Sequence, residues 1–256
     1  MNSSLTVDRE LARVSLAEID RGWLGKRRFD SKFLIADSQL SEFINRFSDE
    51  FAILEIAGKS KFQYRTQYFD TPALDCYRDH LQRKSRRAKI RIRSYLDSNL
   101  SRLEVKVRFG NLQSIKFSNE GSKQLGETEA EFVESILQQQ LPNSRLIEES
   151  TNLQPMALNT FERSTLSHAN QQERVTIDSL LAVSAFGREF QIRPGHILLE
   201  VKSLKRSSVV VQALLKSGIR PMSFSKYCAS IDLTTEDRPR VHRPSFLERN
   251  FFESSL

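Results

Sequence analysis

The sequence is poor in cysteine and contains no long apolar run. Its two cysteines, Cys76 and Cys228, are too few for a disulfide framework or a cysteine-ligated zinc site, and they suit a reducing compartment. No stretch approaches the roughly 20 apolar residues that a membrane-spanning helix requires. The first residues have neither the basic n-region nor the apolar h-region of a secretion signal. We therefore expect a cytoplasmic protein without a membrane span, so that any membrane partner would be a separate chain.

Histidine spacing and linker composition exclude further classes. The four histidines do not have the spacing of metal ligands, so we expect surface or structural roles for His80, His168, His196 and His242. Internal repeats, low-complexity tracts and glycine–serine linkers are absent. With 39% hydrophobic residues and 17 phenylalanines, the 256-residue chain is typical of a packed protein of one large domain or two small ones.

Positive charge is abundant and concentrated in one segment. The chain has 39 Lys and Arg residues against 32 Asp and Glu, which gives a formal net charge of +7. Between Arg83 and Arg108, ten bases and two acids give a local charge of +8. Such a concentration indicates an anionic partner, which could be nucleic acid, a phosphorylated small molecule, a phosphate chain or an acidic membrane surface. The alternative is a basic face that is only solvated.

Hydrophobic periodicity predicts both helices and strands. Helical spacing covers residues 38–47, 127–141 and 207–216, and a weaker helical pattern covers 8–20. Alternation of charged and apolar residues predicts six strands, at 28–33, 88–95, 103–108, 161–164, 174–178 and 198–202. Glycine-containing turns at 109–111 and 186–188 indicate antiparallel connections. We therefore predict an α+β fold, and we expect the tail after Thr234 to be loosely attached.

The charged faces of these strands are rich in Arg and Lys with isolated carboxylates. An antiparallel sheet of about eight strands that closes into a barrel has room inside for side chains or one elongated ligand. If the charged faces point inward, the interior is a cationic tunnel. Such a tunnel must hold a polyanion or water, because buried like charges are costly without counterions.

Eight short motifs follow one another in the order of a known family. They are RFDSKF (28–33), YFDTP (68–72), KIRIR (89–93), LEVK (103–106), LQP leading to FER (153–163), RVTID (174–178), LEVK (199–202) and FSKYC (224–228). In this order they resemble the VTC domain, the polyphosphate polymerase domain of the CYTH-like triphosphate tunnel metalloenzymes. The resemblance covers about residues 16–233. It implies one domain at 1–235, with a helical lead-in at 1–25 and a C-terminal tail at 236–256.

The resemblance also implies a fold, a ligand and a metal. The fold is an eight-stranded antiparallel β-barrel with flanking helices, whose tunnel binds triphosphate or polyphosphate and uses Mn²⁺ or Mg²⁺. On the matching positions, the implied phosphate ligands are Lys32, Arg65, Lys89, Arg91, Arg93, Lys106, Arg163, Arg174, Lys202, Ser225 and Lys226. This agrees with elementary chemistry, since the planar fork of arginine suits phosphate oxygens.

Catalytic and metal-binding roles follow from the same motifs. The resemblance implies that Arg91, Arg93, Lys226 and Glu200 are catalytic, and that Glu200 is the metal ligand in preference to Glu104. Mg²⁺ and Mn²⁺ often bind through one or two carboxylates plus substrate phosphates, so a single glutamate suffices. The wider superfamily has a Glu-x-Glu-x-Lys strand, and this chain has Arg28 and Asp30 in place of the two glutamates. This difference shifts the expected metal site to Glu200.

Three functions are compatible with these residues. The first is a polyphosphate polymerase, a phosphotransferase that moves the γ-phosphate of ATP onto a growing chain. The second is hydrolysis of tripolyphosphate or a nucleoside triphosphate in the same site, and the third is a non-catalytic polyphosphate-binding module. Glu200 argues against the third, because a pure anion binder gains nothing from an acid. We expect no sequence-specific nucleic acid partner, since the basic strands lack interleaved aromatic residues.

Overall fold

The structure is a computed structural model that describes residues 11–21, 28–110, 113–121, 124–170, 172–205, 208–235 and 245–254. It divides into two compact units, each built from separate stretches of chain. Unit 1 comprises Met1–Phe62, Phe161–Leu181 and Ile192–Phe224, and unit 2 comprises Gln63–Thr160, Ala182–Gln191 and Ser225–Leu256. Strands β8 (Gln154–His168) and β9 (Glu173–Ala185) contribute residues to both units. The single domain at 1–235 stays a prediction.

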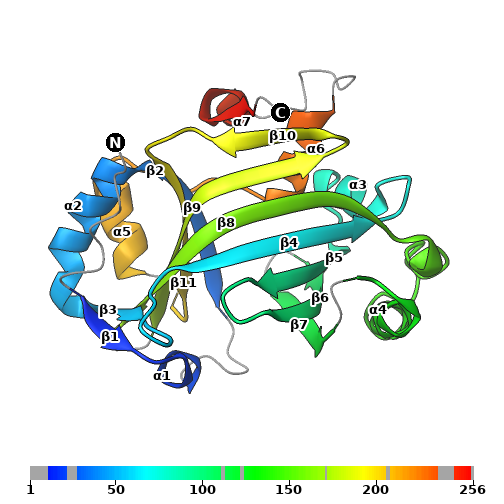
Figure 1. Cartoon of the computed structure of the whole chain (residues 1–256), viewed down its shortest axis with the longest axis horizontal. Coiled ribbons are helices and arrows are strands. Elements are labelled where there is room, and N and C mark those ends of the chain that lie inside the picture. Colours follow the sequence, from blue (N-terminus) through cyan, green and yellow to red (C-terminus); the bar gives the residue numbers. More distant parts are fainter. Residues whose placement is uncertain are drawn as a thin grey trace. The chain divides into compact units, whose positions relative to one another are not determined.

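Unit 1 is a sheet with two helices on one face. Its elements are β1 (Ala12–Val14), α1 (Leu16–Arg21), β2 (Phe29–Ala36), α2 (Asp37–Phe47), η2 (Ser48–Glu50), β3 (Phe51–Leu54), β11 (His196–Ser203), α5 (Val209–Lys216) and parts of β8 and β9. β11 pairs antiparallel with β2 and β9, β3 pairs antiparallel with β8, and β1 pairs parallel with β3. Figure 1 shows α2 and α5 side by side.

The core of unit 1 explains why its sheet has one polar face. Apolar side chains at alternate positions, such as Phe33 on β2 and Leu199 on β11, are buried against Phe43 of α2 and Leu214 of α5. Because successive side chains of a strand point to opposite faces, the charged residues between them lie on the face away from these helices. Alternation in the sequence therefore sets the face on which the candidate ligands lie.

Unit 2 is an antiparallel sheet with helices around it. Its remaining elements are β4 (Phe62–Asp70), α3 (Asp75–Leu81), β5 (Arg86–Tyr95), β6 (Leu100–Phe109), β7 (Gln113–Glu120), α4 (Glu127–Gln140), η3 (Ser150–Asn152), β10 (Arg188–Ile192), α6 (Lys226–Thr234), α7 (Ser245–Asn250) and β12 (Phe251–Glu253). β4, β5, β6 and β7 pair in that order. Alternation again buries one face, where Ile90 and Val105 pack with Leu137 of α4.

The predicted fold class is confirmed. The chain has an antiparallel sheet and flanking helices, and the three strongest helical patterns correspond to α2, α4 and α5. All six predicted strands exist, as parts of β2, β5, β6, β8, β9 and β11. The turn predicted at 186–188 joins β9 to β10, with Phe186 and Gly187 both at positive φ, as a tight hairpin turn requires. Among the described residues, no helix is both long and apolar enough to cross a membrane.

The weak helical pattern at 8–20 is wrong for part of its length. α1 begins only at Leu16, whereas Ala12–Val14 forms strand β1; residues 8–10 lie outside the described residues. The cause is a capping box, in which the backbone N–H and the hydroxyl of Ser15 both donate to Glu18 Oε2, at 2.9 and 2.6 Å. A capping box starts a helix directly after its serine, so the preceding residues are left to pair with β3.

The expectation of a loosely attached tail is also wrong for residues 245–254. α7 buries Leu247, and β12 pairs with β10. The Arg188 guanidinium donates two hydrogen bonds to the Glu253 carboxylate, at 2.7 and 2.8 Å. The prolines of the tail lie in 236–244, outside the described residues. The expectation from proline content therefore missed the helix and the strand at 245–253.

Glu173→Ala should destabilise unit 1. The Glu173 side chain is 4% exposed and accepts hydrogen bonds from Ser208 Oγ (2.8 Å) and from the backbone N–H groups of Val209 (2.6 Å) and Val210 (3.2 Å) at the start of α5. Removal of the carboxylate leaves these donors unpaired, which should lower the free energy of unfolding by about 1–3 kcal/mol in a urea titration. Glu131→Ala, at an exposed position of α4, is the control; an equal loss in both variants would contradict the assignment.

Candidate functional site

Unit 2 sets basic side chains directly opposite one another on its polar face. The strand register produces four such pairs: Arg87–Arg108, Lys89–Lys106, Arg93–Arg102 and Lys106–Lys116. Opposite residues of antiparallel strands have their Cβ atoms only about 4.5–5.5 Å apart, so like charges there repel. The predicted phosphate ligands Lys89, Arg93 and Lys106 belong to this face.

The buried carboxylate of Glu104 neutralises part of this positive charge. Glu104 is 1% exposed and accepts hydrogen bonds from Arg91 Nε at 2.7 Å and Lys116 Nζ at 3.0 Å, with Arg93 NH2 at 3.8 Å. Burial alone would raise the pKa of Glu104, but the three cations outweigh it and hold the pKa well below its usual range. Because these cations already occupy its carboxylate, Glu104 is poorly suited to bind a metal ion.

The start of α6 brings two further candidates to unit 2. Ser225 caps this helix, since its hydroxyl accepts a hydrogen bond from the backbone N–H of Cys228 at 3.4 Å. Lys89 Nζ donates to the same hydroxyl oxygen at 2.7 Å. Lys226 is the first residue of the helix. Ser225 thus links the cap of α6 to the basic face, and its hydroxyl proton can still be donated.

The motif YFDTP has a structural role in this arrangement. Asp70 accepts hydrogen bonds from the backbone N–H groups of Cys76 (2.9 Å) and Tyr77 (3.0 Å) in α3, and from the hydroxyl of Tyr227 in α6 (2.5 Å). Burial raises the pKa of the Asp70 carboxyl, although these hydrogen bonds oppose the shift. Asp70 therefore joins α3 to α6, directly beside the predicted ligands Ser225 and Lys226.

Unit 1 has a second polar face, on β2, β9 and β11. The register sets Glu200 opposite both Lys32 and Thr176, and sets Lys202 opposite both Asp30 and Arg174. Directly paired residues of antiparallel strands project from the same face. These side chains therefore lie in two neighbouring rows, each of which contains one acid, Glu200 in the first and Asp30 in the second.

Protein groups already engage two of the predicted phosphate ligands on this face. Lys32 Nζ donates to the backbone carbonyl of Phe224 at 2.9 Å, which satisfies a donor but leaves the charge unneutralised. Arg163 binds Asp178 with two hydrogen bonds, at 2.5 and 2.8 Å, and both side chains are largely buried. A phosphate group that binds Arg163 through its planar edge must therefore compete with Asp178.

Burial changes the acidity of two bases of unit 1. Burial lowers the pKa of Lys202 to about 8; the nearby Glu200 opposes this shift and Arg163 adds to it. Burial also lowers the pKa of Arg174, and the carboxylate of Asp20, bonded to Arg174 NH2 at 3.1 Å, opposes it. An anion bound beside either base would favour its charged form and so oppose this shift.

The surroundings of Glu200 provide oxygen donors for a divalent cation. Thr176 lies directly across β9, is 3% exposed, and its Oγ1 has no hydrogen-bond partner among the described residues. A carboxylate and a hydroxyl are ligands that Mg²⁺ and Mn²⁺ accept, with substrate phosphates to complete the coordination. Within the described part of the chain there is no group of three or more His, Cys, Asp or Glu that could hold a metal by itself.

Arg65 lies apart from the other predicted ligands of unit 2. The register sets it opposite Ser94, so alternation turns its side chain to the face away from Arg93, and it is exposed. Its neighbour Thr66 takes the position opposite Arg93. Nothing in the sequence marks Thr66 as a candidate, because a threonine in a strand carries no charge.

The predicted site residues thus lie in two groups. Unit 1 contains Lys32, Arg163, Arg174, Glu200 and Lys202, and unit 2 contains Arg65, Lys89, Arg91, Arg93, Glu104, Lys106, Ser225 and Lys226. Apart from Arg65, the strand residues of each group share one face with others of the group. Their roles in binding and catalysis stay predictions.

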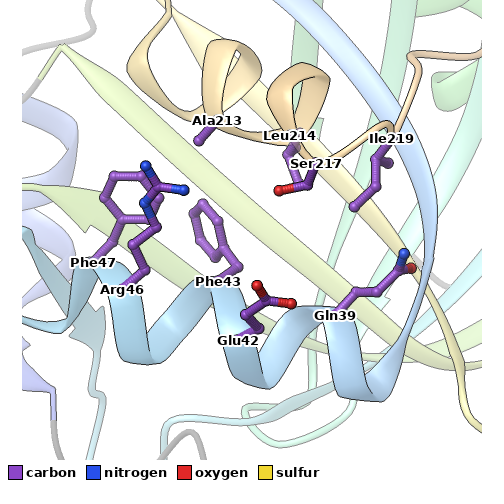
Figure 2. A pocket seen from close by; sticks show the side chains of 9 residues that line it. All are labelled: Gln39, Glu42, Phe43, Arg46, Phe47, Ala213, Leu214, Ser217 and Ile219. Carbon is purple, nitrogen blue, oxygen red and sulfur yellow. The ribbon is translucent and has the colours of Figure 1, made fainter.

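A small pocket between α2 and α5 is separate from the polar face of unit 1. Figure 2 shows Phe43 and Phe47 of α2 directed toward α5, with Glu42 and Arg46 on the same helix. Its other lining residues are Gln39, Ala213, Leu214, Ser217 and Ile219. With one acid and one base in a partly apolar lining, the pocket lacks the repeated bases that a phosphate chain needs.

Comparison with known proteins establishes the family. The model of the VTC domain matches residues 27–235, most of the chain, so the protein belongs to the VTC domain family. The resemblance inferred from the eight motifs is therefore confirmed. No curated protein matches this sequence.

Two solved structures show distant similarity to this chain. A protein from Bacillus halodurans described as a candidate adenylate cyclase is 15% identical, with a TM-score of 0.47, over 78% of this chain and 94% of its own. A Hippeastrum protein, described as an adenylyl cyclase candidate with a dominant triphosphatase activity, is 13% identical, with a TM-score of 0.44, over 83% of this chain and 98% of its own. Because both TM-scores are below 0.5, neither similarity supports a conclusion about this chain.

Lys202→Met should change the pH dependence of stability. The pKa of Lys202 is about 8 in the folded chain and 10.5 for an ordinary lysine, so between these values the unfolded chain binds the proton more tightly. This residue therefore makes the wild type more stable as pH rises through that window, and the variant should lack this contribution. Urea titrations of both proteins at about pH 7, 9 and 10 measure it. Parallel pH profiles would show that Lys202 has an ordinary pKa.

Proposed function

We propose that this member of the VTC domain family is a metal-dependent polyphosphate polymerase. In this proposal it transfers the γ-phosphate of ATP to the end of a phosphate chain. The two polar faces bind phosphate groups, and the predicted eight-stranded tunnel is the setting of the reaction.

The observation that best supports this proposal is the set of like-charged pairs in unit 2. Four pairs of bases stand directly opposite one another across β5, β6 and β7, a pairing that by itself destabilises a sheet. Only Glu104 and Glu120 contribute carboxylates to the paired polar positions of β6 and β7. A polyanion on this face would convert the repulsion into attraction, and a phosphate chain carries nearly one charge per unit.

Phosphoryl transfer makes modest demands on the protein. The terminal oxygen of the phosphate chain attacks the γ-phosphorus, and the bond to the leaving ADP oxygen breaks, which requires in-line positioning and charge neutralisation. Arg91 and Arg93 can bind equatorial oxygens through their planar edges, and Lys226 supplies a further positive charge at the start of α6. Glu200, with Thr176, would hold the Mn²⁺ or Mg²⁺. When bound, this ion neutralises phosphate charge and polarises a phosphoryl oxygen.

Incubation with ATP and Mn²⁺ should distinguish the candidate reactions. We expect long phosphate chains on a gel together with ADP, whereas free phosphate alone would indicate the hydrolase that shares the same ligands. Tripolyphosphate should also raise the melting temperature, because it binds only the folded state. An unchanged melting temperature at millimolar tripolyphosphate would contradict any phosphate-chain function.

Glu200→Gln should abolish metal-dependent turnover. The substitution keeps the shape of the side chain but removes the charge that a divalent cation requires. Affinity for tripolyphosphate without metal should stay equal or rise, because a repulsive charge has gone from the face that contains Lys32 and Lys202. Glu131→Gln, on the exposed side of α4, is the control. Full Mn²⁺-dependent activity of Glu200→Gln would refute the metal assignment.

A further inference from the structure

One cross-strand row of unit 2 contains three buried donors without acceptors. Thr66 on β4 lies opposite Arg93 on β5, and Arg93 lies opposite Arg102 on β6. Among the described residues, Thr66 Oγ1, Arg93 Nε and Arg102 Nε are all buried and have no hydrogen-bond partner. Figure 1 shows these three strands next to one another. Three unpaired polar atoms in one row are notable, because buried polar groups are normally satisfied.

The chemistry of these atoms identifies what is missing from the row. A guanidinium has five donors and no acceptor, so Arg93 and Arg102 cannot satisfy each other, and a hydroxyl can donate its proton as well. The group that completes the row must therefore offer hydrogen-bond acceptors to donors on three adjacent strands. A cation cannot do this, and an oxyanion can.

The charge around the row also favours an anion. The Glu104 carboxylate lies 3.8 Å from Arg93 NH2, but it is already bonded to Arg91 and Lys116. Glu120, the next residue of the row, bonds Arg102 NH2 at 3.4 Å and is 70% exposed, so its charge is well screened by water. The side chains grow more exposed along the row, from 1% for Thr66 to 14% for Arg93 and 39% for Arg102. A ligand could thus reach the row from β6, with Thr66 at its inner end.

We propose that Thr66, Arg93 and Arg102 form a subsite for one phosphoryl group of a phosphate chain. The Thr66 hydroxyl and the two Nε–H groups donate to its oxygens, and the guanidinium charges offset its negative charge. The subsite rests on the proposed function for the identity of its ligand. It adds two ligands, Thr66 and Arg102, to the residues predicted from the sequence.

Calorimetric titration with tripolyphosphate in the absence of metal tests the subsite. Thr66→Val keeps the size of the side chain and removes the donor, so we expect affinity to fall about tenfold or more, the effect of one lost hydrogen bond to a charged group. Thr66→Ser keeps the hydroxyl and should retain most of the wild-type affinity for tripolyphosphate. Arg102→Lys keeps the charge but lacks the Nε donor, and we expect a loss of similar size.

Matched controls separate lost ligand contacts from damaged structure. Ser94→Ala removes a hydroxyl on the other face of β5 that bonds Ser101 at 2.9 Å, and Arg86→Lys changes an exposed arginine of the same strand without loss of charge. Both should bind tripolyphosphate as the wild type does. Wild-type affinity in Thr66→Val and Arg102→Lys would overturn the subsite and leave the proposed function standing, and would mean that water fills the row. A wild-type protein that does not bind tripolyphosphate would overturn both.

Discussion

The polar face of unit 2 depends on a single buried carboxylate. Glu104 lies among Arg91, Arg93 and Lys116, and it is the acid that bonds two of them directly. Without it, these bases would repel one another across β5, β6 and β7, because no other carboxylate among the described residues pairs with them. One shared acid leaves an excess of positive charge, so the face can be stable in the folded chain and still attract an anion. This balance between stability and residual charge is the main physical constraint on any function of unit 2.

In unit 1 the basic side chains do not share one carboxylate. Its bases have separate partners: Arg163 is held by Asp178, Arg174 by Asp20, and Lys32 by a backbone carbonyl. Glu200 shares its face with Lys202, whose pKa burial lowers. Carboxylates therefore offset the charges of Arg163 and Arg174, whereas the carbonyl bound to Lys32 leaves its charge unneutralised. Glu200 lies on this face opposite Thr176, whose hydroxyl has no hydrogen-bond partner among the described residues, whereas one row of unit 2 contains three donors without acceptors.

Two residues of the motifs, Asp70 and Ser225, have roles in the fold. Asp70 joins the start of α3 to α6 through its hydrogen bonds with Cys76 and Tyr227. Ser225 caps α6 and also accepts a hydrogen bond from Lys89. These contacts position the start of α6 and with it Lys226, and the phosphate-binding role of Ser225 stays a prediction. A sequence motif can combine residues that hold the fold with residues that bind a ligand, and only the contacts in the structure distinguish the two.

Alternation and helical periodicity in the sequence were sufficient to predict the α+β class, three helices, six strands and the basic faces, because these features depend on local spacing. Sequence alone did not show that residues 12–14 pair as a strand, that the tail joins β10, or that Arg65 faces away from Arg93 while Thr66 faces it. Those outcomes depend on register, which aligns residues far apart in the chain. The choice of partner for each base, whether carboxylate, carbonyl or none, likewise required the tertiary structure, since hydrogen bonds form between side chains that only folding brings together.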